Sequence, residues 1–411
     1  MTGSSEEPTG SPTKKLGDVV KNFDSKRIPL SSRERALRQG KFPYYGAAGC
    51  IDGVDNYIFE GLYLLVGEDG SVVRDDGTPF LQMVSGKFWV NNHAHVLKGE
   101  DDIETRYLYY ALKTLNISSR VTGAVQPKLN QGNLNSLVIV YPDRSDRERI
   151  VTILGALDDK IEMNRRINET LEHMARALFK SWFIDFDPVH AKAGRRQPAG
   201  MDKATADLFP DSFVDSELGK IPKGWTAGSV YEISEVKYGA PFASSLFNST
   251  GTGKPLVRIR DLADESPAVF TTEVHPKGYL LQPGDIAVGM DGEFRAYLWA
   301  GIESWLNQRI CVFAPKEGFS AAFVRNSIMG PLSEVESTET ATTVIHLGKN
   351  DIDRFKVVIP NTEITKAFRH LCQPWYDQVV ANKQQSRTLS ALRDSLLPKL
   401  LSGEYPIKAH Q

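Results

Sequence analysis

The 411-residue chain is long enough to hold two or three domains, each with a core of its own. Its hydrophobic content of 41% and charged content of 24% are those of a soluble globular protein, and a net charge of −2 excludes a uniformly basic nucleic-acid binder. No apolar run approaches the ~20 residues that a membrane span needs, and no secretory leader opens the chain. Three widely separated cysteines, Cys50, Cys311 and Cys372, argue against a disulfide framework and a cysteine metal site, and they indicate a cytoplasmic protein.

The first residues combine a low-complexity start with a basic stretch. Residues 1–13 are rich in Gly, Ser, Pro and Thr, and we expect them to be disordered because they cannot bury enough apolar surface. Residues 14–41 hold nine Lys or Arg against three Asp or Glu, and this local charge of +6 could neutralise phosphates. A solvated surface loop has the same composition, and charge alone favours that interpretation.

Two β-rich domains, each followed by a long helix, are predicted along the rest of the chain. Short alternating segments such as LYLLV, FWVNNHAHV, DIAVGM and RICVFAP are separated by Gly, Asp, Asn and Pro turns, which is typical of β structure. The predicted order is a β-rich domain at 14–142, a spacer helix at 143–184, a Pro- and Gly-rich connector at 185–224, a second β-rich domain at 225–361, a second spacer helix at 362–402 and a tail at 403–411.

The two halves repeat one another. VTGAVQPKLNQGNLNSLVIVYP, which ends at Pro142, is echoed 218 residues later by TETATTVIHLGKNDIDRFKVVIP, which ends at Pro360. FWVNNHAHVLKG and LLVGEDGSVV are echoed by SWLNQRICVFAP and IAVGMDGEFR at shifts of 216 and 222. Shifts that differ by a few residues are those of a duplicated fold with insertions in its surface loops.

Both helices have a coiled-coil seam that is apolar at its ends and polar at its centre. In the first helix the heptad positions run from Ile150 to Trp182, with Asn164 and Asn168 in the middle, and the repeat places Asn382 at the position of Asn164. In an antiparallel pair Asn164 would meet Asn382 near the crossing point, where a buried polar layer fixes the register. The alternative is that these asparagines face water in a loosely packed region.

The length of the helices also bears on their use. Each has about 38 residues and would span ~57 Å at ~1.5 Å per residue. Pro374 lies within the second helix, so we expect a kink there or a break into two pieces.

The segments that come near to known catalytic motifs all lack residues that those motifs require. GTGKP at 251–255 lacks the first glycine and the Ser/Thr of a phosphate loop, and PD at 210–211 with EVK at 235–237 is only a loose match to nuclease spacing. His93 and His95 share a strand face without a third ligand in view, and FDPV at 186–189 lacks the second proline and the aromatic residue of an amino-methyltransferase motif. The sequence therefore predicts a chain without catalysis or a cofactor of its own.

The repeated plan resembles the specificity (S) subunit of type I restriction-modification enzymes over nearly the whole chain after the first ~15 residues. The resemblance rests on YYGAAG, GAVQPKLNQGNLNSLVIVYP, LEHMARALFKSWFIDFDPV, GKIPKGW and LRDSLLPKLLSGE. It implies an α+β fold with two β-rich target-recognition domains, joined by two long antiparallel coiled-coil helices in a pseudo-two-fold internal repeat. TATTVIHLGKNDI in the second half matches the family's Gln-Pro-Lys-Leu pattern poorly, so contacts there are less well defined.

The same resemblance implies what the chain would do. Each domain would read one half of a split site on double-stranded DNA, and the helices would set the spacing and dock two methyltransferase (M) subunits. S-adenosylmethionine would belong to those subunits, and ATP and Mg would belong to the restriction/translocation (R) subunits. Because the recognition stretches of the halves differ, the site should be asymmetric, with half-site centres about one helical turn (~10 bp) apart.

Candidate DNA contacts follow from turn position and residue type, since base edges are read by Arg, Lys, Asn, Gln and acidic side chains. The alternative for any one of them is a core aromatic residue or an acidic residue that merely forms a turn. Competing functions are a coiled-coil adaptor that does not bind DNA and a nuclease or methyltransferase fragment. The candidates are Lys41, Tyr44, Tyr45, Glu68, Asp69, Ser71, Gln126, Lys128 and Asn130 in the first domain, and Tyr238, Asp291, Glu293, Arg295, Gln308 and Arg309 in the second.

Overall fold

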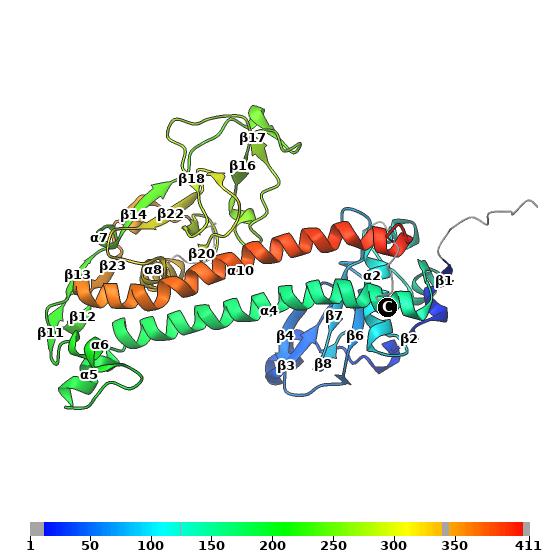
Figure 1. The fold of residues 1–411 in the computed structure, drawn as a ribbon, viewed down its shortest axis with the longest axis horizontal. Helices are drawn as coiled ribbons and strands as arrows, with labels where there is room; N and C mark the ends of the chain where they lie inside the picture. Colours follow the sequence, from blue (N-terminus) through cyan, green and yellow to red (C-terminus); the bar gives the residue numbers. More distant parts are fainter. Residues whose placement is uncertain (1–11, 124, 339–344, 406–411) are drawn as a thin grey trace, which may run out of the picture. The chain divides into compact units, whose positions relative to one another are not determined.

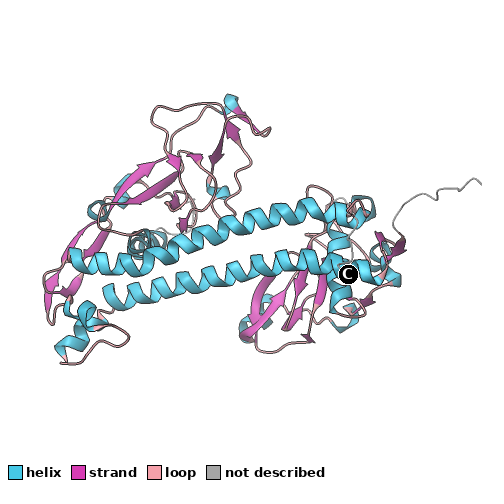
Figure 2. Ribbon diagram, in the orientation of Figure 1, coloured by secondary structure: helices cyan, strands magenta, loops and turns pink. Residues whose placement is uncertain are grey.

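The computed structural model describes residues 12–123, 125–338 and 345–405, and the chain divides into two compact units (Figure 1). Unit 1 comprises the chain up to Ile161 together with the part from Thr388 onward, and unit 2 comprises Glu162–Arg387. Figure 2 shows that each unit combines strands with a segment of each long helix. Most of the segment expected to be disordered lies outside the described residues, but Thr13 already belongs to a strand.

Two four-stranded sheets form the first β-rich domain, in the orders β2-β9-β6-β7 and β4-β3-β8-β5. The central strand β6 reads YLLVG, and its residues Leu64, Leu65 and Val66 have no exposed surface, which is typical of a strand covered on both faces. A third pair, β1 with β10, joins the start of the domain to its end. The strands are β1 (Thr13–Lys15), β2 (Lys21–Asn22), β3 (Gln39–Tyr45), β4 (Cys50–Val54), β5 (Phe59–Glu60), β6 (Tyr63–Gly67), β7 (Leu81–Val84), β8 (Lys87–Val90), β9 (Ala94–Lys98) and β10 (Val138–Val140).

Helices cover this domain and close its core. Tyr107, Leu108 and Leu112 of α2 pack with β6 residues and with the parts of the two long helices that belong to unit 1. The helical elements up to the first long helix are η1 (Leu16–Asp18), η2 (Asp24–Lys26), α1 (Ser32–Leu37), α2 (Asp102–Lys113), η3 (Ser118–Arg120), α3 (Gln131–Asn135) and α4 (Arg144–Phe183).

The second β-rich domain repeats this topology. Its sheets have the orders β14-β22-β19-β20 and β15-β17-β16-β21-β18, and β13 pairs with β23 as β1 pairs with β10. The parallel pair β3–β8 has its counterpart in the parallel pair β16–β21. The strands are β13 (Thr226–Ser229), β14 (Ser234–Tyr238), β15 (Phe247–Asn248), β16 (Lys254–Val257), β17 (Phe270–Thr271), β18 (Leu280–Leu281), β19 (Ile286–Gly289), β20 (Ala296–Leu298), β21 (Ser304–Leu306), β22 (Ile310–Pro315) and β23 (Lys356–Ile359).

The connector at 185–224 is more than a linker. It holds two helices and a hairpin of strands β11 (Phe213–Ser216) and β12 (Gly219–Pro222), and Val189, Phe209 and Ile221 are buried in the core of unit 2. Its Pro and Gly residues lie in the turns between these short elements, which is why composition alone suggested a connector without structure of its own. The remaining helices are α5 (Asp187–Ala193), α6 (Lys203–Asp207), α7 (Val230–Ile233), η4 (Ser244–Leu246), η5 (Ile259–Asp261), α8 (Ala321–Thr338), α9 (Lys349–Ile352) and α10 (Thr362–Ser402).

The two long helices α4 and α10 begin in the same way. The carboxylate of Asp143 accepts a hydrogen bond from the Asp146 N–H at 2.9 Å, and the amide oxygen of Asn361 accepts one from the Ile364 N–H at 3.0 Å. Asp143 and Asn361 are 218 residues apart, so equivalent N-caps start equivalent helices.

The seam positions of α4 and α10 are buried or half-buried, as the heptad pattern predicts. Ile150 and Leu154 of α4 lie with Leu400 of α10 in the core of unit 1, and in unit 2 Ala175 and Trp182 lie with Phe368. The pairing runs antiparallel within each unit. In unit 2, for example, Asn164 contacts Gln385 and Phe183 contacts Phe368.

The expected break at Pro374 does not occur, because α10 is continuous over 41 residues. Proline removes one helical hydrogen bond, but Pro374 and His370, whose carbonyl loses its partner, are both exposed, so water can bind that carbonyl. Phe368, Cys372 and Tyr376 on the opposite face are buried in the core of unit 2 and hold the helix together. Among the described residues, no helix combines the length and the hydropathy needed to cross a membrane.

Candidate nucleic-acid interface

In the first domain, the turn after β6 and the segment before α3 are hydrogen-bonded to one another. The Gly70 N–H donates to the Pro127 carbonyl at 3.1 Å, and the Leu129 N–H donates to the Glu68 carbonyl at 2.8 Å. Asp69 and Lys128 form an isolated β-bridge between the two segments. The structure thus brings together three of the predicted contacts, the neighbours Glu68 and Asp69 and, about 60 residues further along the chain, Lys128.

The segment of residues 126–130, called here the recognition segment, is held at both ends. Thr122 and Lys128 exchange backbone hydrogen bonds of 2.8 and 2.7 Å, and the amide oxygen of Asn130 accepts from the Asn133 N–H at 2.8 Å to cap α3. Gln126, Lys128 and Asn130 are exposed. The segment therefore presents amide and ammonium groups to solvent on a fixed backbone, which suits contacts with base edges.

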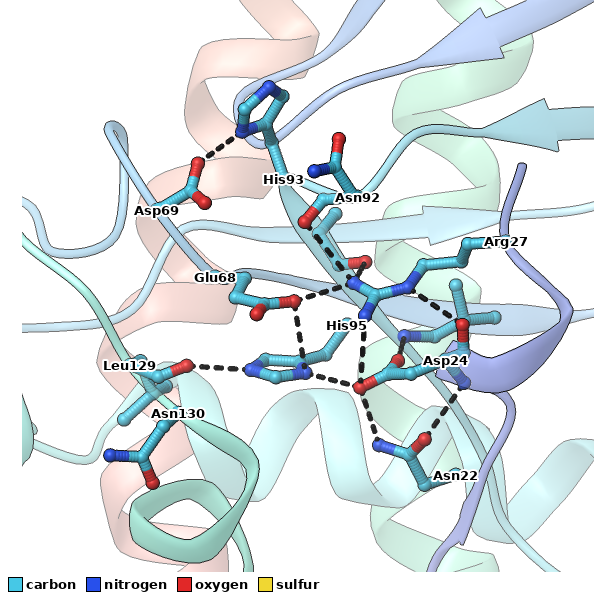
Figure 3. Close-up of polar contacts among 12 residues, drawn as sticks. Asn22, Asp24, Arg27, Glu68, Asp69, Asn92, His93, His95, Leu129 and Asn130 are labelled. Carbon is cyan, nitrogen blue, oxygen red and sulfur yellow. Dashed lines mark hydrogen bonds and ion pairs between the residues drawn. The ribbon is translucent and has the colours of Figure 1, made fainter. Parts of the chain in front are cut away.

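A charged cluster that is largely buried lies directly behind the recognition segment (Figure 3). It consists of Asp24, Arg27, Glu68 and His95, and only Glu68 was predicted to belong to the site. Arg27 donates to Glu68 at 2.6 Å and to the Ala94 carbonyl at 2.7 Å, and its guanidinium lies 3.6 Å from Asp24. The ring of His95 bonds Asp24 at 2.6 Å through Nδ1 and the Leu129 carbonyl at 2.7 Å through Nε2.

The pairing shifts the pKa of both members of the His95–Asp24 pair. Burial works against the charged form of Asp24, but hydrogen bonds from His95 and the Val96 N–H outweigh it and lower the pKa of the carboxyl. Burial likewise works against the charged form of His95, yet the hydrogen bonds to Asp24 and to the Leu129 carbonyl raise the pKa of the imidazole. Both shifts favour the ionised pair at neutral pH.

Asp24, Glu68 and His95 also place one ligand atom each within 4.8 Å of one another, which is the spacing of a metal site. The donor set does not suit a metal ion, because the Arg27 guanidinium already lies between the two carboxylates. Its positive charge neutralises them where a cation would bind. Of the two histidines of the NHAH motif only His95 belongs to this group, and the cluster is an ion-pair network.

His93 and Asp69 form the outer part of this site. The ring nitrogen Nδ1 of His93 is hydrogen-bonded to the Asp69 carboxylate, and the His93 side chain is 48% exposed. Lys128 Nζ lies 3.6 Å from Glu68 with half of its side chain exposed. The outer surface thus offers a carboxylate, an imidazole and an ammonium group side by side.

The second domain has the equivalent pair of segments. The Gly292 N–H donates to the Ile345 carbonyl at 3.1 Å, and the Leu347 N–H donates to the Met290 carbonyl at 2.8 Å. These are the bonds of Gly70 and Leu129, moved by the 222- and 218-residue shifts of the repeat. The same backbone frame therefore positions the turn after β19.

Different side chains occupy that second frame. Asp291 stands where Asp69 stands in the first domain, but its partners are His346 at 2.8 Å and Arg309 at 3.5 Å. Arg309 also contacts the His346 ring at 3.3 Å. Two predicted residues, Asp291 and Arg309, thus meet at the site, whereas His346 was missed because its segment matched the family pattern poorly.

The other candidates of the second domain lie near this frame or are exposed. Glu293 and Arg295 form an ion pair with each other on the surface of the turn after β19, and Gln308 is exposed next to Arg309. Residues 339–344, which correspond to the stretch that ends at Gln126, lie outside the described residues.

Two predicted contacts have a buried hydroxyl group, and their contact with DNA stays a prediction. Tyr44 is 1% exposed in a small core with Val54 and Trp89, and its hydroxyl accepts from the Leu30 N–H at 2.8 Å. The hydroxyl of Tyr238 on β14 is buried, and burial raises the pKa of that group. The apolar ring of each tyrosine packs against a hydrophobic core cluster of its domain.

The remaining candidates of the first domain are separate from the cluster or less exposed. Tyr45 lies on β3 and packs edge-on against Phe88 at 5.9 Å between ring centroids, and Lys41 is exposed at the start of that strand. Ser71 is half-buried in the turn after β6.

The centre of the α4–α10 seam in unit 2 holds a layer of buried amides. Asn164 donates to the Asn382 carbonyl at 3.3 Å and to Gln385 at 2.8 Å, and Asn382 donates to Asn168 at 2.8 Å. The three asparagines are 0%, 8% and 5% exposed for Asn164, Asn168 and Asn382. Asn164 and Asn382 therefore do lie in contact, with Asn168 as the side-chain partner of Asn382, while their part in fixing the register stays a prediction.

Comparison with known proteins places this arrangement in a family. A model described as the type I restriction modification DNA specificity domain matches residues 8–173 and again residues 222–394. The type I restriction enzyme MjaIX specificity subunit of Methanocaldococcus jannaschii is 28% identical over 327 residues, which cover 75% of this chain and 71% of the relative. The HindI specificity subunit of Haemophilus influenzae is 27% identical over 329 residues, which cover 68% of this chain and 71% of the relative.

A solved structure shares the fold. The type I restriction-modification S subunit from M. genitalium superposes with a TM-score of 0.53 at 15% identity, over 97% of each chain. The two matches of the family model coincide with the two halves of the internal repeat and together cover most of the sequence. The chain therefore belongs to the type I restriction-modification DNA specificity family.

Proposed function

We propose that this chain is the DNA-reading subunit of a type I restriction-modification complex, in which each β-rich domain reads one half of an asymmetric, bipartite site on double-stranded DNA. Two methyltransferase subunits would dock on the α4–α10 pair, and restriction/translocation subunits would complete the assembly. S-adenosylmethionine, ATP and Mg would be bound by those partners, so this chain would recognise DNA without catalysing a reaction.

One observation supports the proposal above all. The turn after β6 and the turn after β19 are held by the same two backbone hydrogen bonds, but the side chains on the two frames differ. The first frame presents Asp69 with His93 and Lys128, whereas the second presents Asp291 with Arg309 and His346. A common frame with different donors and acceptors is what two readers of different base sequences need.

The chemistry of these side chains suits base edges in the major groove. Arg and Lys donate to the O6 and N7 acceptors of guanine, and a carboxylate accepts from the amino group of cytosine. In each domain the Asp also orients its basic neighbours, so its replacement should disturb a small group of contacts at once. Exposed Lys and Arg away from this frame would contact phosphates, which affects affinity and its salt dependence more than sequence preference.

The matched pair Asp69→Asn and Asp291→Asn tests the proposal. The full chain is produced with its methyltransferase subunits, and genomic DNA methylated by the complex is sequenced. We expect Asp69→Asn to relax one half of the methylated motif by roughly 5- to 150-fold, which corresponds to ~1–3 kcal/mol for one base contact. Asp291→Asn should relax only the other half.

Two results would contradict the proposal. If each Asn variant relaxed both halves equally, the domains would not read separate half-sites. If no motif depended on this chain at all, the adaptor function without DNA binding would be the better account. Lys203→Ala is a control of surface charge, because Lys203 on α6 is 85% exposed and lies outside both frames.

A further inference from the structure

His95 lies buried between two groups that accept hydrogen bonds and do not donate them (Figure 3). Its side chain is 1% exposed, with Nδ1 at 2.6 Å from the Asp24 carboxylate and Nε2 at 2.7 Å from the Leu129 carbonyl oxygen. A carbonyl has no proton to donate, and an ionised carboxylate only accepts. Both ring nitrogens must then carry a proton, so the ring is a positively charged imidazolium.

The charges around the ring agree with this assignment. In the part of the chain that the structure describes, the ring is faced by Asp24 and Arg27 from the η2 region, by Glu68 from the end of β6, and beyond Glu68 by Lys128. With an imidazolium, the two largely buried carboxylates are balanced by the two cations that share their burial, His95 and Arg27, whereas Lys128 has half of its side chain exposed. A neutral ring would leave excess negative charge in a buried place and one acceptor without a donor, both of which destabilise a folded structure.

The charged ring holds one peptide group of the recognition segment. The Leu129 side chain is fully buried, its N–H donates to the Glu68 carbonyl at 2.8 Å, and its carbonyl accepts from His95. Lys128 and Asn130, both candidates for contact with bases, flank this peptide. The hydrogen bond from Nε2 of His95 therefore holds the Leu129 carbonyl in place between these two side chains.

The second domain keeps the backbone frame without the charges. Met290 stands at the position of Glu68 and Cys311 at the position of His95, by the shifts of 222 and 216 residues. Met290 is 6% exposed and Cys311 is fully buried, with Cys311 Sγ 3.9 Å from the Val288 carbonyl. The thiol is a weak donor, and burial raises the pKa of Cys311 to about 12, so this position does not change charge near neutral pH.

We propose that His95 is a buried imidazolium that positions the recognition segment, so that reading of the first half-site, unlike that of the second, depends on its protonation. His95 is a positioning residue, since it acts on DNA only through Leu129. The DNA part of this inference rests on the proposed function, whereas the charge of the ring does not.

The direction of the pH dependence follows from the shift in pKa. Burial alone would lower the pKa of His95, but its bonds to Asp24 and Leu129 raise it above the usual value of 6.5. The stabilisation from the proton is fully present below the unfolded-state pKa of about 6.5 and is lost as pH rises through the raised folded-state pKa. A neutral ring can donate to Asp24 or to Leu129 but not to both, so the segment loosens at high pH.

Nitrogen NMR of the full chain, labelled with 15N-histidine, tests the charge directly. At about pH 6.5, where an unperturbed histidine is half protonated, we expect both nitrogens of His95 to be protonated and to exchange slowly with water. His95→Gln assigns the signal, and His370→Gln, at an exposed position on α10, provides the reference histidine. An unprotonated ring nitrogen at His95 at that pH would overturn the inference.

The effect on recognition is measured as a ratio between the half-sites. Methylation of duplexes with one mismatch in either half-site is followed from about pH 6 to pH 9 with the whole complex, so that effects on the methyltransferase cancel. Discrimination at the first half-site should fall roughly tenfold as His95 loses its proton, the size of one positioned base contact. His95→Gln should remove this fall at the first half-site and leave the pH profile of the second half-site, where His346 lies, as it is in the unaltered protein.

The possible failures are distinct. A first half-site whose discrimination does not change with pH, or an unchanged profile in a folded His95→Gln variant, would overturn the positioning role. If His95→Gln does not fold, the profile of the unaltered protein and its NMR signal decide the matter. Absence of any sequence-dependent methylation would contradict the proposed function, while the NMR result would still decide the charge of the ring.

Discussion

Replacing Asn164 and Asn382 separately by leucine should have unequal effects on stability, although both asparagines are buried in the same layer. The side-chain oxygen of Asn164 is buried without a hydrogen-bond partner among the described residues, which costs about 1–3 kcal/mol. Leucine removes that oxygen and gains about 1.5 kcal/mol from apolar burial. Two of the bonds lost go to Gln385 and Ser386, which are exposed and half-buried and can bind water instead. The third goes to the Asn382 carbonyl, which keeps its bond from the Ser386 hydroxyl at 2.8 Å. We expect Asn164→Leu to change the free energy of unfolding by less than about 1 kcal/mol.

Asn382→Leu removes two hydrogen bonds, and only one of the two partners left behind can bind water instead. Asn382 donates to the Asn168 oxygen at 2.8 Å and accepts from Gln378 at 2.7 Å. Gln378 is exposed, but Asn168 is only 8% exposed, so its oxygen would stay buried without a donor. This orphaned acceptor should cost about 2 kcal/mol.

Urea unfolding followed by far-UV circular dichroism measures the difference. Both variants should keep the slope with denaturant, with a shift of the midpoint to lower urea only for Asn382→Leu. The reasoning would be refuted by equal destabilisation of the two variants, or by a larger loss for Asn164→Leu. In either case the buried oxygen of Asn164 would have a partner that this account lacks.

Three further predictions concern the domains and the spacing between them. The Glu265 side chain is 6% exposed and forms ion pairs with Lys383 at 2.8 Å and Arg387 at 2.6 Å. Glu265→Gln should lower the free energy of unfolding in urea by about 2 kcal/mol, less than for a fully buried ion pair because both cations are one-third exposed. No loss would show that these ion pairs do not stabilise the fold. Tyr44→Phe loses the hydrogen bond from the Leu30 N–H and should lower the free energy of unfolding by about 1 kcal/mol, while the methylated motif stays the same. A changed motif would indicate that Tyr44 does contact DNA. Insertion of four residues at the centre of α4 should lengthen the unread spacer of the motif or abolish methylation, whereas an unchanged spacer would exclude a role of the helices in spacing.

The repeat and the seam could be predicted from the sequence because both depend on regular spacing. The heptad pattern places Ile150, Leu154 and Ala175 correctly in buried positions, and the 218-residue shift pairs the caps Asp143 and Asn361. Periodic patterns reflect the geometry of the helix itself, which does not depend on distant parts of the chain.

The charged cluster could not be predicted in the same way. Arg27 and Glu68 are 41 residues apart, and Asp24 and His95 are 71 residues apart, so their meeting depends on the order of the strands in the sheet. The sequence did show a basic stretch that contains Arg27 and a histidine pair that contains His95. Neither pattern shows that a carboxylate lies opposite each of them.

The burial of an aromatic residue is hard to predict for a related reason. Tyr44 has a polar hydroxyl and a large apolar ring, so its residue type fits a DNA contact as well as a core position. The choice depends on whether a backbone N–H such as that of Leu30 lies within reach of the hydroxyl inside the domain. Tertiary contacts likewise decide the outcome at Pro374, because the burial of neighbouring side chains stabilises the helix by more than the exposed proline destabilises it.

The central claim is that this chain alone decides which bipartite sequence is methylated, and sequencing of methylated DNA from an exchange experiment tests it most directly. Residues 14–140 are replaced by the first recognition domain of another family member, in the presence of the same methyltransferase subunits. The account predicts that one half of the motif changes while the other half and the spacer length stay the same. A motif that changes in both halves, or one that does not change at all, would contradict it.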